Sequence, residues 1–113
     1  MKLEKVYNKL VRDNIPEIII EDNQVPVTRV LDKEEYRKAL EEKILEEYNE
    51  VLETIGEDRL KELADLLEII KSLAELENSS LDEVLKIAKE KREKRGGFSK
   101  KIYLEKIICD EQN

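Results

Sequence analysis

Residues that interrupt helices are scarce in this sequence, and that scarcity limits the folds open to it. The 113 residues include only three glycines and two prolines, whereas 43% of them are charged. A β-sandwich or barrel needs many turns, so this composition effectively excludes those folds and favours long amphipathic helices with charged outer faces. The length suits one domain, and we therefore predict a single all-α domain over residues 1–113.

Capping signals divide the chain into helical segments. Asn14 is a candidate cap and Pro16, two residues later, suits the first turn of a helix, so a short helix is predicted over residues 15–22. Asp32 and Glu35 have the spacing of a capping box, and the helical pattern that they open continues up to Gly56, a residue typical of the position after a helix. Two more helices are predicted, over about 58–77 and from Ser80 up to Gly96. These segments predict an antiparallel helical bundle.

Three long helices leave an apolar face uncovered, so we expect oligomerisation to complete the bundle. Two short β segments are also considered, near residues 27–31 and 100–107, because apolar and polar residues alternate there. The second segment fits either a strand paired with the first or an extended arm.

Several classes of site and location are excluded or disfavoured by composition. Histidine is absent and Cys109 is the single cysteine, so zinc sites of cysteine and histidine, and catalytic triads built on histidine, are not available. The net charge of −7 disfavours nucleic acid polymers as partners. No run of 18 apolar residues and no signal peptide is found, so we expect a cytoplasmic protein with no membrane partner.

Acidic side chains recur on the apolar faces of the two central helices. At about 100° per residue, Glu47 falls inside the apolar sector of the first long helix and Glu50 lies at its edge. Glu62 and Asp65 are placed in the same way on the second. Glu46 is predicted to point to the opposite, solvated face. Acidic pairs at this spacing are common on solvated helices, but their placement in both apolar sectors favours a site.

Spacing about Gly56 brings these four carboxylates to one level. Glu47 and Asp65 are each nine residues from Gly56, and Glu50 and Glu62 are each six away. An antiparallel hairpin that turns near Gly56 would gather them into one acidic cluster. Like charges in a partly buried site need protons or cations, and a donor set made only of oxygen suits Mg²⁺, with Mn²⁺ as the alternative. The four residues are thus predicted metal ligands.

Basic residues in two segments are candidates for binding phosphate. Each run taken alone is also typical of a solvated helix end, but phosphate is the expected ligand opposite a metal cluster. Phe98 follows two glycines and is the best-placed aromatic side chain for stacking on a base. The candidate cations are Lys9, Arg12, Lys91, Lys94 and Arg95.

Four separated motifs resemble the all-α nucleoside triphosphate pyrophosphohydrolases of the MazG and phosphoribosyl-ATP pyrophosphatase-like group. The motifs are KLVRDNIP at residues 9–16, EEYNE at 46–50, ELAD at 62–65 and RGGF at 95–98. The resemblance implies Mg²⁺-dependent cleavage of a nucleotide between its α and β phosphates, which gives a monophosphate and pyrophosphate. It also implies a homodimer or homotetramer, and removal of damaged nucleotides as the cellular role.

By position, the resemblance makes the same four acidic residues the metal ligands. We expect Glu47 to orient or deprotonate the attacking water, and the candidate cations to stabilise the pyrophosphate leaving group. Two other interpretations stay open. One is a phosphoribosyl-ATP pyrophosphatase, and the other is a non-catalytic helical oligomerisation or adaptor module.

Overall fold

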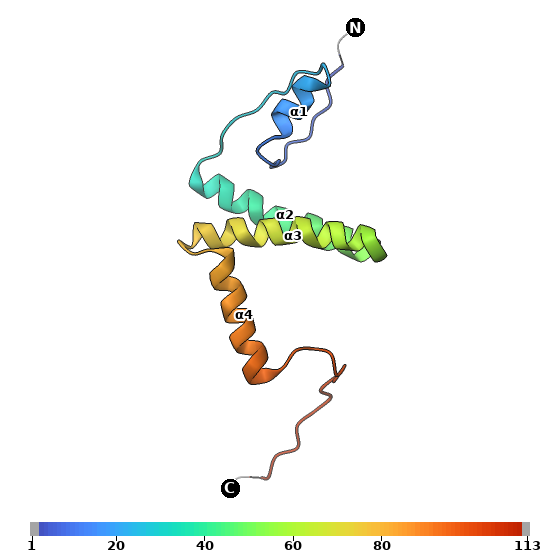
Figure 1. The fold of residues 1–113 in the computed structure, drawn as a ribbon, viewed down its shortest axis with the longest axis vertical. Helices are drawn as coiled ribbons and strands as arrows, with labels where there is room; N and C mark the ends of the chain where they lie inside the picture. Colours follow the sequence, from blue (N-terminus) through green and yellow to red (C-terminus); the bar gives the residue numbers. More distant parts are fainter. Residues whose placement is uncertain (1–2, 112–113) are drawn as a thin grey trace. The chain divides into compact units, whose positions relative to one another are not determined.

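Four α-helices are the regular secondary structure of residues 3–111, the part of the chain that the computed structural model describes (Figure 1). No strand occurs in that part, so the predicted all-α class is confirmed. None of the four helices is both long enough and apolar enough to cross a membrane. The helices are α1 (Ile15–Glu21), α2 (Lys33–Glu53), α3 (Gly56–Leu76) and α4 (Leu81–Arg95).

The chain divides into two compact units. The first extends to Leu81 and contains α1, α2 and α3, and the second begins at Asp82 and contains nearly all of α4 and the carboxyl-terminal segment. Within the first unit α2 and α3 form an antiparallel hairpin (Figure 1). The assignment of all 113 residues to one domain stays a prediction, and each unit is described by itself below.

The two ends of α2 are fixed by local hydrogen bonds. The Asp32 side chain accepts from the Glu35 amide at 2.9 Å, and the Glu35 side chain accepts from the Asp32 amide, so the predicted capping box is present. At the other end Thr54 Oγ1 donates to the Glu50 carbonyl oxygen at 2.9 Å. These contacts satisfy backbone groups that a helix end leaves free.

The turn between the central helices lies two residues earlier than the sequence predicted. Thr54 and Ile55 are extended, and Gly56 is the first residue of α3 rather than the residue that closes α2. Gly56 has a φ of +62°, which glycine adopts without the steric cost that a Cβ would bring. Arg59 Nε donates to the Thr54 carbonyl oxygen at 2.7 Å and closes the connection.

The hairpin has a small core. The buried apolar residues among those described are Leu40, Ile69 and Ala74. Three apolar residues on each helix, spaced i, i+3 and i+7, are between 42% and 65% exposed; they are Leu45, Tyr48 and Leu52 on α2 and Leu60, Leu63 and Leu67 on α3. We call these six residues the apolar face.

The two considered β segments form no strand among residues 3–111, and both stay predictions. Residues 25–32 and 101–107 have no regular secondary structure, because a strand needs a hydrogen-bonded neighbour and the described residues provide none there. Most apolar side chains of these segments are exposed, as at Val27 and Tyr103. The pairing of the two segments stays a prediction.

Candidate metal site

Glu47 is the buried charged residue of the described chain. Its side chain lies on the α3-facing side of α2, and the residue is only 7% exposed. Its Oε2 atom is buried and has no hydrogen-bond partner. A buried carboxylate oxygen without a partner costs stability, so its retention favours a ligand at this position.

Two acidic residues of α3 face Glu47 across the hairpin. One carboxylate oxygen from each of Glu47, Glu62 and Asp65 lies within 4.8 Å of the other two. Glu62 also has a buried Oε2 atom without a hydrogen-bond partner. The structure therefore brings together three of the four residues that the sequence predicted to converge, and we call these three the carboxylate cluster.

Glu50, the fourth predicted ligand, is half-buried one turn further along α2. A hydrogen bond to the Glu62 carboxyl, followed by burial and the charge of Glu62, raises the pKa of Glu50 above its usual range. Glu50 thus interacts with the carboxylate cluster through Glu62.

Burial is the main reason that the pKa of Glu47 is raised. A hydrogen bond with Glu62 opposes this shift, and the negative charges of Glu50, Asp65 and Glu46 add to it. Burial and the charges of neighbouring carboxylates contribute to both raised pKa values, since like charges in a poorly solvated space disfavour ionisation. A bound cation would relieve this cost.

Cations reach only the edge of the carboxylate cluster. Arg12 Nη2 lies 2.7 Å from Asp65 Oδ1, and Lys9 Nζ lies 3.7 Å from Glu46 Oε1. Lys43 Nζ lies 3.3 Å from the other oxygen of Glu46. Within residues 3–111 no lysine or arginine pairs with Glu47, Glu50 or Glu62. No basic side chain of the described residues therefore neutralises the centre of the cluster.

The donor set fits a hard divalent cation. Mg²⁺ binds carboxylate oxygens at about 2.1 Å, so ligands on opposite sides of the ion are about 4.2 Å apart. The 4.8 Å limit on the separations in the carboxylate cluster is close to that distance. Glu47 and Glu62, whose buried oxygens have no partner, and Asp65 are the residues that would hold the ion.

The remaining predicted cations belong to the second unit. Lys91, Lys94 and Arg95 line a hollow of about 250 Å³ on α4, together with Ile87 and Glu90. This volume is below the range of about 300 to 1,000 Å³ that is usual for small-molecule pockets. The approach of these residues to the carboxylate cluster stays a prediction.

Phe98, the predicted stacking residue, also belongs to the second unit and is 98% exposed. Its ring therefore has no apolar packing of its own in this chain. Its role in binding a base stays a prediction.

Sequence reasoning missed the role of Glu46. It was predicted to point to the solvated face, but it is half-buried and pairs with Lys9 and Lys43 beside the carboxylate cluster. Lys43 precedes Glu46 by three residues on the same helix, a spacing that favours an ion pair. That spacing was the signal from which the position could have been found.

The raised pKa of Glu47 predicts how pH affects stability without metal. The folded protein holds this proton to higher pH than the unfolded chain, so stability from Glu47 is greatest below about pH 4.3, the usual glutamate pKa, and is lost as pH rises through the folded pKa. In EDTA, we subtract the thermal midpoint of the original protein from that of Glu47→Gln at each pH. This difference should increase as pH rises over this window. Parallel pH profiles of the two proteins would contradict the prediction.

Comparison with known proteins gives no similarity on which to base a family assignment. No protein-family model, no curated protein and no solved structure matches the chain. The functional argument therefore rests on the residues and their geometry.

Proposed function

We propose that this chain is a Mg²⁺-dependent nucleoside triphosphate pyrophosphohydrolase that cleaves between the α and β phosphates. The observation that carries the proposal is the buried Oε2 atom of Glu47, which has no hydrogen-bond partner and belongs to a carboxylate that faces Glu62 and Asp65 across the hairpin. A cation would neutralise such a cluster, and phosphoryl transfer is chemistry that Mg²⁺ held by carboxylates supports. The resemblance of the four sequence motifs supports the same substrate class.

Acidic residues have two tasks in this reaction. Glu47, Glu62 and Asp65 would hold the ion, with Glu50 as the fourth expected ligand one turn away, and the bound ion would neutralise phosphate charge and acidify a water. Glu47 would also orient the water or take its proton with the oxygen that is not on the ion. No covalent nucleophile is required.

Basic residues would stabilise the leaving pyrophosphate. Lys9 and Arg12 already lie beside the carboxylate cluster, at Glu46 and Asp65. Lys91, Lys94 and Arg95 are the further cations of the proposal, with Phe98 to stack on the base. The cellular role that fits is removal of damaged nucleotides from the cytoplasmic pool.

We also propose that a homodimer or homotetramer is the active form. Each residue of the apolar face follows a buried or half-buried residue of its helix by one position, which rotates it by about 100° from that residue. Because α2 and α3 are antiparallel, this rotation moves the three apolar residues of each helix to the same side of the helix pair. Glu46 and Asp65 instead precede the buried Glu47 and the half-buried Leu66, so they are rotated to the other side, where they pair with Lys9 and Arg12. A second copy could cover the apolar face and leave the carboxylate cluster open.

The direct test is pyrophosphate release from a panel of normal and modified nucleoside triphosphates, with Mg²⁺ and with EDTA. We expect release of one pyrophosphate for each monophosphate formed, only when Mg²⁺ or Mn²⁺ is present. Activity on phosphoribosyl-ATP alone would identify the narrower pyrophosphatase. No hydrolysis of any compound would remove the enzyme proposal.

The exposed apolar face favours one other candidate, a non-catalytic oligomerisation or adaptor module. That function does not use the carboxylate cluster as a metal site. The double variant Glu50→Gln with Asp65→Asn would then leave partner binding and assembly unchanged, and Mn²⁺ would bind neither protein.

A further inference from the structure

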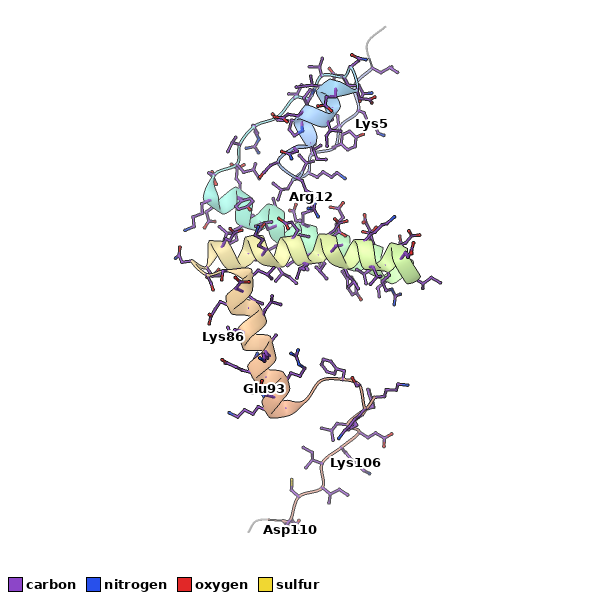
Figure 2. All side chains as sticks on the ribbon, in the orientation of Figure 1. Lys5, Arg12, Lys86, Glu93, Lys106 and Asp110 are labelled. Carbon is purple, nitrogen blue, oxygen red and sulfur yellow. The ribbon has the colours of Figure 1, made fainter. Side chains whose placement is uncertain are left out.

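An arginine occupies one edge of the carboxylate cluster. Arg12 lies in the segment before α1 (Figure 2). Its guanidinium donates to Asp65 Oδ1 at 2.7 Å. The two residues are 53 positions apart, so this contact joins the amino-terminal segment to α3. The same carboxylate belongs to the set that could hold a divalent cation.

Arg12 and a divalent cation would compete for Asp65. The guanidinium is a positive charge placed directly on one member of the carboxylate cluster, whereas the other two members have no cationic partner in the described chain. A divalent ion bound by all three carboxylates would place a second positively charged group next to the Arg12 guanidinium. Like charges at such short range repel, so the ion pair and the ion at Asp65 oppose each other.

The ion pair is well suited to be broken. Its side chains are 58% exposed for Arg12 and 43% exposed for Asp65, and ion pairs at such exposure contribute little to stability. Lys9, three residues earlier, pairs with Glu46, which is outside the carboxylate cluster. The Lys9 contact therefore does not depend on Asp65 and does not oppose the release of Arg12.

We propose that Arg12 is an internal counter-cation that Mg²⁺ displaces from Asp65, and that the released guanidinium then binds substrate phosphate. The inference rests on the proposed function and adds a sequence of events to it. Metal binding makes the arginine available, so the phosphate-binding group is presented only when the metal is in place. Arginine suits this exchange because its planar donors match carboxylate and phosphate equally well.

The first test measures Mn²⁺ binding to the full chain by titration calorimetry. Arg12→Gln removes the exposed ion-pair partner of Asp65. The variant should therefore bind Mn²⁺ about two- to fivefold more tightly than the original protein. Lys43→Gln is the matched control, because it removes one positive charge from the same neighbourhood through Glu46. We expect a smaller change there, and equal changes in both variants would overturn direct displacement in favour of a general charge effect.

The second test follows the arginine itself. The Nε–H signals of the arginine side chains are recorded by NMR while Mg²⁺ is added. The Arg12 signal should move, whereas Arg29 and Arg37, which pair with Glu35 and Glu77, should keep theirs. An Arg12 signal that stays in place while Mg²⁺ binds would overturn the proposal.

The third test uses inorganic pyrophosphate at saturating Mg²⁺. Loss of a charge-assisted phosphate contact should weaken pyrophosphate binding to Arg12→Gln by about tenfold or more. Unchanged affinity would overturn the transfer of Arg12 to phosphate. If the original protein binds no Mn²⁺ at all, the proposed function itself fails. Metal binding with identical affinities in the original protein and Arg12→Gln defeats only the inference about Arg12.

Discussion

Glu62→Gln should lower Mg²⁺-dependent pyrophosphate release at least about 100-fold, since loss of outer contacts to metal ligands alone commonly costs 10- to 100-fold. Glu62 interacts with both Glu47 and Glu50, so it joins the acidic residues of the site. Without metal the same variant should be more stable than the original protein, because one like charge is removed from a poorly solvated space. Steady-state rates and thermal midpoints in EDTA measure the two effects.

Glu68→Gln is the matched control for this prediction. It places the same substitution on the same helix at an exposed position outside the carboxylate cluster. Its rate and its midpoint should both stay near those of the original protein. A fully active Glu62→Gln would remove Glu62 from the site, and equal losses in both variants would indicate a general effect of charge on α3.

Leu52→Glu should prevent the chain from assembling and should strongly reduce its stability. Leu52 is 60% exposed on the apolar face, and in an assembly its burial would contribute about 1.5 to 3 kcal/mol. A carboxylate at this position would lose that contribution and introduce an unpaired charge into the interface. Sedimentation equilibrium should give a multiple of 13.3 kDa for the original protein and 13.3 kDa for the variant.

Leu3→Glu is the control for assembly, because Leu3 is an exposed leucine outside the helices. It should leave the mass unchanged. A monomeric original protein would contradict the prediction, and so would a Leu52→Glu variant that assembles as well as the control.

Helix type and the helix face of the acidic residues could be predicted from the sequence because both depend on local spacing. The capping box at Asp32 is a contact between near neighbours, and the placement of Glu47 follows from 3.6 residues per turn. The position of the turn was less accessible. Glycine is favoured both after a helix and where φ is positive, and Gly56 meets the second condition at the start of α3.

Contacts between distant segments could not be predicted with the same detail. The sequence suggested Arg12 as a phosphate ligand, but its approach to Asp65 depends on how the segment before α1 lies on the hairpin. The ion pair between Lys9 and Glu46 was missed for the same reason, because it also depends on how the segment before α1 lies on the hairpin. Helical periodicity gives the face of a residue on its own helix but not the partner that another segment brings to it.

The short connection at Thr54 and Ile55 makes the acidic site sensitive to length changes in the turn. One extra residue there, if it extended α3, would rotate each α3 side chain by about 100° and shift it by about 1.5 Å relative to α2. Glu62 would then leave the level and the side on which it meets Glu47. Variation among natural versions of this chain should therefore replace residues in the turn without adding or deleting any.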